Sequence, residues 1–501
     1  MTKTQKADIT DYFNVYKQSI PVFVSDAQYD GHYNRYCKQI IWPTFHYQIP
    51  DNPKTKVWEK NSWEHYVTVN KAFAEAIVSQ YKRGDTVWVN DYHLLLVPKM
   101  VRELIPHAMI GLFLHIAFPS SEVFRCLPGT PHLTSSKLTS ARSDLLEGAL
   151  GSTLVSFQTR EYARHFVQTC SRILAVEAVE NGVMLDDRLI RIICSPIGIE
   201  LAALEQNIAE PQAVAAASFL REKYAGKHLL VSRDKFDHIR GLKPKMLAYE
   251  RFLADHPEWH GKVVFIQVAL LGAESDEGQL LSDVNEIVTR VNSMYGNIIY
   301  QPLLFRHQDF EFLDYLGMLC AADSFVNTSL REGWNLTSHE YVVCQKDNGH
   351  HPFILSEFVG SADLFTDSAI LVNPWDIKGM ADAIHRVLTM SRQERDERWE
   401  RAFHHVKTQD ATVWVKGFLD ELKKAYTEQQ RGVPTVIPKL HVETYANTYS
   451  QSEKRLFLLD YEGSYRSLEY ANIRVTGGLV EWARDCFDHN ASSRCSLERS
   501  R

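Results

Sequence analysis

Two cations lie five residues apart in the stretch VSRDKFDHIRG, residues 231–241: Lys235 and Arg240. The apolar run HLLV just before it is typical of a buried strand, and GLKPKMLAYERFLADH after it has helical apolar spacing. Cations at such a crossing can hold a phosphate or diphosphate, because α/β sheets bind ligands at the carboxyl ends of their strands. A solvated basic turn would carry the same residues, so this stretch alone does not distinguish it from a phosphate site.

Short apolar runs alternate with longer amphipathic ones and would position these cations. The predicted strands are 86–90, 109–115, 153–158, 191–197, 228–232, 262–270, 324–329 and 352–358. Several are continuously apolar, as parallel strands covered on both faces should be. The predicted helices between them include 92–104, 160–174, 279–295 and 310–322. This alternation predicts doubly wound α/β domains.

The composition bounds the domain count and the class of partner. At 501 residues the chain exceeds one core, and about 150 residues per domain suggests two or three. The net charge of −7 argues against a nucleic-acid surface. Eight cysteines without a CxxC spacing suit a reducing compartment. With no signal-type segment and no run of about 18 apolar residues, we expect a cytoplasmic protein with no membrane span.

The passage between two such domains is predicted near 200–225. A helical run from 375 to 431 would close the second domain, and the segment RGVPTVIPKLHVET, with two prolines, indicates a linker at 431–452. The Ser- and Thr-rich stretch 129–140 has no amphipathic period, so we expect a surface loop or an insertion there.

Seven motifs carry a resemblance to a known family. In order they are WVNDYHLLLVP, FLHIAFPSSEVFRCLP, REYARHF, PIGIE, DKFDHIRG, REGWNLTSHEY and ILSEFVGSA, and they resemble trehalose-6-phosphate synthases, glycosyltransferase family 20. The resemblance implies an α/β GT-B fold with two Rossmann-like domains facing a cleft. We expect an acceptor-side domain at 1–200, truncated at its N-terminus, and a nucleotide-sugar domain at 201–430. It also implies UDP-glucose as donor, glucose 6-phosphate as acceptor, and no cofactor or metal.

The opening stretch aligns with the family's DRLDYIKG. Lys235 then stands for the usual arginine, and Arg240 for the usual lysine. Both charges are kept, but a planar guanidinium and a point-charge ammonium offer different donor geometry. Without a metal, such donors must stabilise the diphosphate leaving group, and one displaced donor can remove about 100-fold from turnover.

The second donor motif is REGWNLTSHE where the family reads RDGMNLVSYE, so Gly333, Asn335, Leu336 and Glu340 match. The resemblance assigns the ribose hydroxyls to Glu340 and phosphate to the amides near Asn335 and Leu336, at a helix start. The family's aspartate, which contacts the glucose, is Glu332 here. One extra methylene moves a carboxylate by more than about 1 Å, which is costly at a positioning site.

On the acceptor side, Tyr33 and Trp42 match aromatic residues that contact the sugar phosphate, and Asp91 and His115 match residues that contact the hydroxyls of the two sugars. The family grips the acceptor phosphate with two arginines. The PSRGD arginine corresponds to Ala273, and no segment like the family's Gly-rich loop precedes Tyr33. Each lost bond to a charged group costs about 1.5–3 kcal/mol, so we expect little or no synthase activity.

The stretch KRLFLLDYEGSYRS, 454–467, resembles the first motif, D-x-D-G-T, of haloacid-dehalogenase-type phosphatases. Asp460 keeps the nucleophile position, whereas Glu462 replaces the acid and Ser464 the threonine. Too few residues follow for the remaining strands, metal-binding acids or a cap. We therefore expect 453–501 to be an incomplete phosphatase start, with Asp460 a relic; an edge strand ending in a turn is the alternative.

Three functions stay open. The first is a non-catalytic or weakly active regulatory or scaffold subunit, similar to the synthase-like domain of the larger subunits of the fungal trehalose synthase complex. Its partners would be synthase and phosphatase subunits in a hetero-oligomer, with UDP-glucose or UDP as a possible ligand. The second is an active UDP-glucose-dependent glucosyltransferase with a shifted acceptor preference, and the third an incomplete trehalose-6-phosphate phosphatase subunit.

Overall fold

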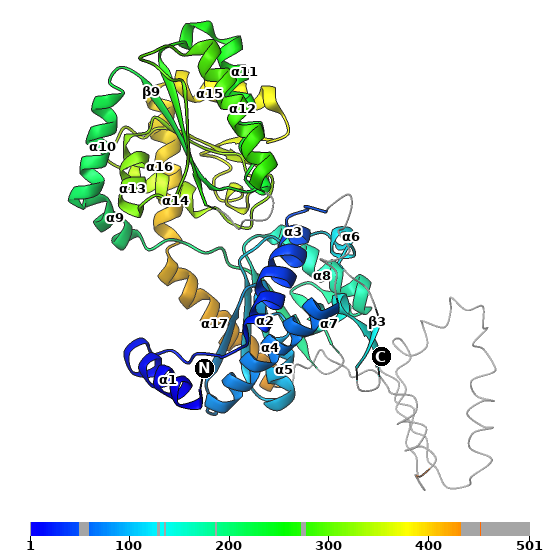
Figure 1. Ribbon diagram of the computed structural model, residues 1–501. Coiled ribbons are helices and arrows are strands. Elements are labelled where there is room, and N and C mark those ends of the chain that lie inside the picture. The colour runs from blue at the N-terminus through cyan, green and yellow to red at the C-terminus, as the bar shows by residue number, and fades with distance from the viewer. Residues whose placement is uncertain are drawn as a thin grey trace, which may run out of the picture. The chain divides into compact units, whose positions relative to one another are not determined.

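The computed structural model describes residues 2–49, 60–127, 131–134, 137–185, 188–271, 277–431 and 451. The chain divides into two compact units, Met1–Val433 and Pro434–Arg501. All helices and strands below belong to the first unit (Figure 1). Apart from residues 431 and 451, the predicted linker and the predicted phosphatase-like start lie outside the described residues.

The first sheet has the strand order β1-β2-β5-β8-β7-β6. Strands β1, β2, β5 and β8 run parallel, and the β6–β7 hairpin is added antiparallel at β8. The apolar run MIGLFL of β2 is almost wholly buried, as expected of a central parallel strand with helices on both faces. The bounds are β1 Thr86–Asn90, β2 Met109–Leu114, β5 Leu154–Phe157, β6 Glu177–Val179, β7 Gly182–Met184 and β8 Leu189–Cys194.

Helices in the first half precede, connect and cover these strands. They include one wide π-type helix, η1, a rare form that is common at functional sites. The bounds are α1 Lys3–Lys17, α2 Asp26–Tyr29, η1 Asp30–Ile41, α3 Trp42–Phe45, α4 Lys60–Gln80, η2 Tyr92–Leu94, α5 Val97–Leu104, α6 Ser121–Phe124, α7 Ala141–Ala149 and α8 Arg160–Leu174.

The second sheet is parallel throughout, with the order β11-β10-β9-β12-β13-β14. Its central strands alternate between two core clusters: Leu230 packs on one face and Val231 on the other. The bounds are β9 His228–Lys235, β10 Val263–Leu270, β11 Leu303–His307, β12 Ser324–Asn327, β13 Phe353–Ser356 and β14 Ile370–Val372.

Helices cover both faces of the second sheet (Figure 1). Helices α9, α10, α13, α14 and α16 contribute to one core cluster, and α11, α12 and α15 to the other. The bounds are α9 Leu201–Ala209, α10 Pro211–Lys223, η3 His238–Arg240, α11 Leu242–Asp255, η4 Pro257–Trp259, α12 Glu277–Tyr295, α13 Phe312–Ala321, α14 Leu336–Cys344, η5 Gly360–Ala362, α15 Ile377–Thr389, α16 Arg392–Thr408 and α17 Ala411–Gln430.

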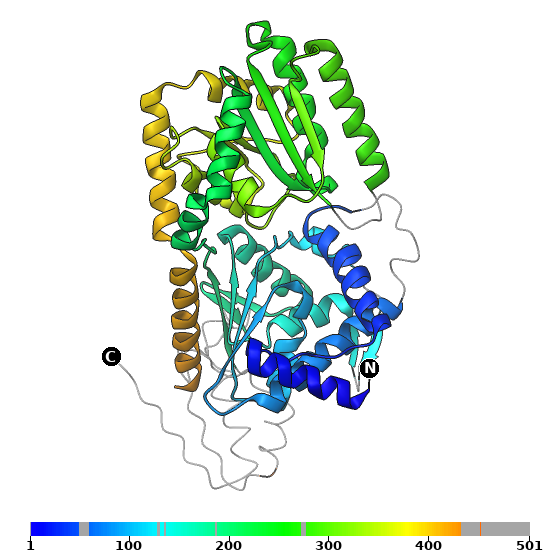
Figure 2. The same ribbon diagram turned by 60° about the vertical axis from the view of Figure 1, so that its left-hand side comes forward.

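The last long helix, α17, packs against the first sheet, although the sequence analysis places it in the domain 201–430. Figure 2 shows α17 beside the strands of that sheet. The Phe418 ring stacks on Trp88 at a centroid distance of 4.2 Å, and a Cβ on Gly111 would lie 2.7 Å from the same ring. Arg191 of β8 also pairs with Glu428 at 2.8 Å. Helix α17 thus returns to the first half, and the predicted domain bounds stay a prediction.

All eight predicted strands occur within three residues of their expected bounds. Strands β6, β7, β11 and β14 are additional. The stretch 129–140, expected to be a loop, contains an antiparallel pair, β3 Pro131–Thr134 and β4 Lys137–Ser140. Among the described residues, no helix combines the length and apolar character needed to cross a membrane.

Candidate functional site

The turn after β9 folds around two buried side chains, Phe236 and Ile239. Asp237 closes the turn by accepting a hydrogen bond from the Arg240 amide at 3.0 Å. Burial of the apolar pair fixes the turn, on which Lys235 is exposed and Arg240 is largely covered. The predicted strand-to-helix crossing is therefore present, with its cations at the carboxyl end of β9.

Gly241 links this turn to α11 in a conformation that requires glycine. Its φ is 65°, and a Cβ there would lie 2.1 Å from the carbonyl oxygen of Thr328. The close approach locks the start of α11 against the end of β12. It also holds the turn in one position relative to the second donor motif.

A buried ion pair supports the turn from behind. The Lys245 ammonium on α11 donates to Asp234 Oδ2 at 2.6 Å, to Ser232 Oγ at 2.6 Å and to Gln267 Oε1 at 3.1 Å. The amide of Gln267 and the hydroxyl of Ser232 also donate to that Asp234 oxygen. Each charge is thus neutralised and hydrogen-bonded, which burial of ions demands.

Arg240 and Glu332, predicted separately as donor-site positions, form an ion pair between Nη1 and Oε1. The second carboxylate oxygen of Glu332 accepts from Ser329 Oγ at 3.1 Å and from Asn335 Nδ2 at 3.2 Å. Burial opposes the charge of Arg240, yet the carboxylates of Glu332 and Asp237 hold its pKa above the ordinary value. The two side chains are only 14% and 13% exposed, so water screens this pair weakly.

Lys235 differs from Arg240 in its surroundings. Its side chain is exposed, and among the residues that the structure describes its ammonium has no hydrogen-bond or ion-pair partner. Arg233, two residues earlier on the same strand, lies over the Tyr315 ring at 4.5 Å. Of the two predicted cations, Lys235 is therefore the one open to an anion.

Glu340, predicted to face the ribose hydroxyls, is held by α13. The Tyr315 hydroxyl donates to Glu340 Oε2 at 2.7 Å. Burial raises the pKa of Glu340, while the Tyr315 hydrogen bond and the charge of Arg233 oppose the rise. Asn335 caps α14 by accepting from the Ser338 amide at 2.9 Å, so Leu336 is the first residue of that helix.

In the first half, Asp91 and His115 meet at the ends of β1 and β2. Asp91 has φ 65° and ψ 179°, a backbone region that is nearly restricted to glycine. Its Oδ1 accepts from the His115 amide at 3.2 Å, and burial raises its pKa to about 6. His115 Nε2 lies 3.1 Å from Asn90 Oδ1, and burial lowers the His115 pKa to about 4. A neutral imidazole beside a strained acid is typical of a functional position.

The second donor motif packs directly on this strand end. A Cβ on Gly333 would lie 2.3 Å from the His115 carbonyl oxygen and 2.7 Å from Ile116. The Tyr162 hydroxyl donates to the Glu332 carbonyl oxygen at 3.1 Å. The structure therefore brings Glu332 and Gly333 together with His115, as the resemblance implies for a donor and an acceptor that must meet.

The predicted acceptor residues lie on η1 and α3. Tyr33 stacks on His93 with centroids 5.6 Å apart, and the Lys38 ammonium lies 4.4 Å from the Tyr33 ring centre. The Trp42 ring packs on the His46 ring, with the ring centroids 3.9 Å apart. Burial, together with the charges of Arg240 and Arg331, lowers the His46 pKa to about 3.

Arg331 is a site residue that the sequence analysis missed. Its guanidinium lies 3.9 Å from the Tyr47 ring centre, and its charge reaches the imidazole of His46. Arg233 and Tyr315 were missed as well. Arg233 could have been found, because residues 233 and 235 point to the same face of a strand; Tyr315 lies in a helix with no motif.

Four predicted positions lie outside the described residues: Ala273, Asp460, Glu462 and Ser464. Within the described ranges, one group could hold a metal ion: His256, Glu258 and His385, whose ligand atoms lie within 4.8 Å of one another. The two imidazole rings stack in parallel at 4.0 Å, so their in-plane lone pairs do not converge on one point. The absence of a metal from the donor site stays a prediction.

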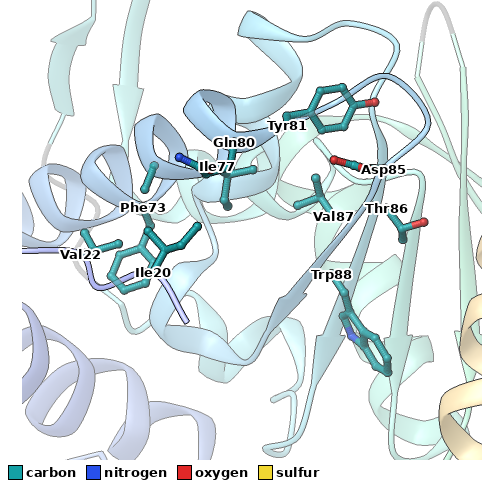
Figure 3. A pocket seen from close by; sticks show the side chains of 11 residues that line it. Ile20, Val22, Phe73, Ile77, Gln80, Tyr81, Asp85, Thr86, Val87 and Trp88 are labelled. Carbon is teal, nitrogen blue, oxygen red and sulfur yellow. The ribbon is translucent and has the colours of Figure 1, made fainter. Parts of the chain in front are cut away.

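A cavity of about 370 Å³ lies between α4, β1 and the segment after α1, and the first motif reaches it with Trp88. Figure 3 shows its side chains, which are mostly apolar and include Ile20, Phe73, Ile77 and Trp88. None of the predicted site residues lines it. The site is therefore defined by the contacts among motif residues.

Comparison with known sequences gives the same family as the motifs. The family profile described as glycosyltransferase family 20 matches residues 1–424. The trehalose synthase complex regulatory subunit TSL1 of Saccharomyces cerevisiae is 42% identical over 485 residues, which cover 96% of this chain and 43% of that protein. The chain thus spans less than half the length of this relative.

Solved structures give the fold. The N-terminal domain of Candida albicans trehalose-6-phosphate phosphatase is similar with a TM-score of 0.76 at 35% identity, covering 85% of this chain and 88% of that chain. The alpha,alpha-trehalose 6-phosphate synthase of Burkholderia multivorans has a TM-score of 0.72 at 28% identity, with 81% and 84% covered. The predicted α/β fold with the GT-B arrangement is confirmed.

Proposed function

Because this chain belongs to glycosyltransferase family 20, we propose that it works in trehalose biosynthesis as a regulatory or scaffold subunit with little or no synthase activity. Its partners would be the synthase and phosphatase subunits of a cytoplasmic trehalose-6-phosphate synthase/phosphatase complex. UDP-glucose or UDP would be its ligand, with no metal required. The likeness to a regulatory subunit supports this assignment.

The observation that carries the proposal is the ion pair between Arg240 and Glu332. A diphosphate leaving group needs a cation that is free to follow its developing charge. Here that cation is already neutralised by a carboxylate, which is itself held by Ser329 and Asn335. A nucleotide must displace or share this pair, and of the two predicted cations only Lys235 is open to it. The donor site therefore supports recognition better than turnover.

The acceptor side supports the same assignment. The aromatic residues Tyr33 and Trp42 are packed in place, but a sugar phosphate also needs cations. The family's PSRGD arginine corresponds to Ala273 in this sequence. The loss of this arginine, at about 1.5–3 kcal/mol per charged hydrogen bond, lowers acceptor affinity by roughly one to two orders of magnitude.

A specific observation favours the active-synthase alternative. The strained backbone of Asp91, its bond to the His115 amide and the contact of Gly333 with His115 preserve a tightly positioned centre. Strain of this kind persists where the surrounding structure enforces it, often for function. The third alternative, the synthase-like part of a phosphatase subunit, is favoured by the likeness to the Candida albicans domain.

Calorimetric titration of the full chain separates these functions. We expect UDP to bind and glucose 6-phosphate to give no heat of binding. Lys235→Ala should weaken UDP binding about tenfold, because it removes one charge-assisted contact. Lys262→Ala, a lysine just before β10 at the opposite end of the sheet, is the matched control. Tight binding of both ligands would favour the active synthase instead.

A further inference from the structure

Two cysteines lie on the neighbouring helices α13 and α14, and their thiols lie beside the same turn of α13. Cys320 lies in the last turn of α13, and Cys344 is the last residue of α14. The sulfur of Cys344 lies 3.9 Å from the Leu316 carbonyl oxygen, one turn before Cys320. Helical side chains lean toward the preceding turn, so the Cys320 side chain covers the same turn. The two thiols are close enough for each to shift the pKa of the other.

The two thiols differ in their access to solvent. Cys320 lines a polar cavity of about 190 Å³, together with Arg221, Lys227 and His351. It is 7% exposed, whereas Cys344 is 1% exposed. The neighbouring Cys344 thiol lowers the pKa of Cys320, with help from the charge of Arg221, and burial raises the pKa of Cys344. Cys320 is therefore the more acidic thiol and the one that a small polar reagent can reach.

We propose that Cys320 and Cys344 form a reversible disulfide when the protein meets a hydroperoxide. The Cys320 thiolate attacks one peroxide oxygen, the O–O bond breaks, and hydroxide leaves and takes up a proton as water. The resulting sulfenic acid is attacked by the Cys344 sulfur; an S–S bond forms, the S–O bond breaks, and the Cys344 proton leaves with the hydroxyl as a second water. Two thiols are oxidised and one hydrogen peroxide becomes two waters.

The bond would act on the donor site through the same two helices. Tyr315 lies five residues before Cys320 on α13, and Glu340 lies one turn before Cys344 on α14. Their 2.7 Å hydrogen bond positions the predicted ribose ligand. An S–S bond of about 2.05 Å draws the two sulfurs closer than any thiol contact, so the helix ends must shift. Resting on the proposed function, this shift weakens UDP binding in the oxidised protein.

The test oxidises the reduced full chain with hydrogen peroxide, blocks the remaining thiols and maps the peptides by mass spectrometry. We expect two of the eight thiols to be lost, with Cys320 and Cys344 in one linked pair that dithiothreitol reopens. Cys126→Ser, which removes an exposed thiol, should leave the link unchanged. Cys320→Ser and Cys344→Ala should each abolish it.

Two results would overturn the inference: Cys320 as sulfinic acid beside a free Cys344 thiol, or either cysteine linked to a different one. Because the linked peptide is sought in the unaltered chain, the test does not depend on a variant folding. UDP titration of reduced and oxidised protein then separates the two proposals. A disulfide without UDP binding in either state contradicts the proposed function alone, whereas equal UDP binding in both states contradicts the coupling.

Discussion

Arg240 and Glu332 neutralise each other across the two donor motifs, and both differ from the residues that the family motifs place there. The family's lysine and aspartate are replaced by an arginine and a longer acid that meet in one ion pair. The two departures are thus one structural change. Because the two charges compensate each other, a diphosphate has to break this ion pair before it can bind Arg240.

Releasing this pair should strengthen nucleotide binding. In Glu332→Gln, Arg240 keeps its charge but loses its carboxylate, so we expect tighter UDP binding together with a loss of about 1–3 kcal/mol in the free energy of unfolding. Calorimetry and urea unfolding measure the two effects. Glu357→Gln, an exposed glutamate near the same motif, is the control. An unchanged UDP affinity in Glu332→Gln would contradict the account.

Asp91 should make the stability of the fold depend on pH. Burial raises its pKa from 3.8 to about 6, so the folded chain binds this proton more tightly than the unfolded chain. The stabilisation is present below about pH 4 and is lost as pH rises through 6, by at most about 3 kcal/mol. Asp91→Asn imitates the protonated form, so its advantage over the unaltered chain should grow between pH 4 and 7. Unfolding curves across that range measure this difference, with the exposed Asp420→Asn as a charge control. A stability difference between Asp91→Asn and the unaltered chain that stays constant with pH would contradict the prediction.

Gly333 and Gly417 should respond oppositely to alanine. A Cβ on Gly333 meets the backbone of His115 and Ile116, so Gly333→Ala forces the donor loop away and costs about 1–3 kcal/mol. Gly417, on α17, has nothing within 4 Å of its Cβ position. Alanine there should stabilise the helix by about 0.5–1 kcal/mol. Thermal unfolding of the two variants measures both effects. Unfolding temperatures that shift in the same direction in both variants would argue against the packing described.

The buried ion pair behind the donor turn should contribute more to the free energy of unfolding than the exposed ion pair nearby on α11. The Lys245 and Asp234 side chains are 1% and 2% exposed, so Lys245→Met leaves a buried carboxylate unpaired and should cost about 3–5 kcal/mol. Lys243, two residues earlier on α11, pairs with Asp283 at 2.7 Å in a more exposed place. Lys243→Met should cost no more than about 1 kcal/mol. Equal losses in urea unfolding would rule out the supporting role of Lys245.

The sequence predicted the fold where a strand is long and continuously apolar, as at 262–270, observed as β10. It missed β6, β7 and β14, because three residues are too few to show a period. It also missed the packing of α17 on the first sheet. Apolar spacing identifies a face on that helix but does not say which sheet the face covers.

The candidate site was predictable residue by residue but not as a set of contacts. Arg240 and Glu332 were each recognised as departures from a motif, yet nothing in their spacing shows that they touch. That contact depends on Gly241 and Thr328, which set the distance between the ends of β9 and β12. The strained backbone of Asp91 could not be predicted either, because the sequence of an aspartate after a strand does not indicate its φ angle.

The central claim is that this site recognises a nucleotide sugar without converting it efficiently. Its most direct test is the rate at which the purified full chain forms trehalose 6-phosphate from UDP-glucose and glucose 6-phosphate, followed by UDP release and by detection of the disaccharide phosphate. The account predicts measurable UDP binding with turnover at or near background. Turnover at roughly 1–1000 per second, the range typical of enzymes, would contradict it.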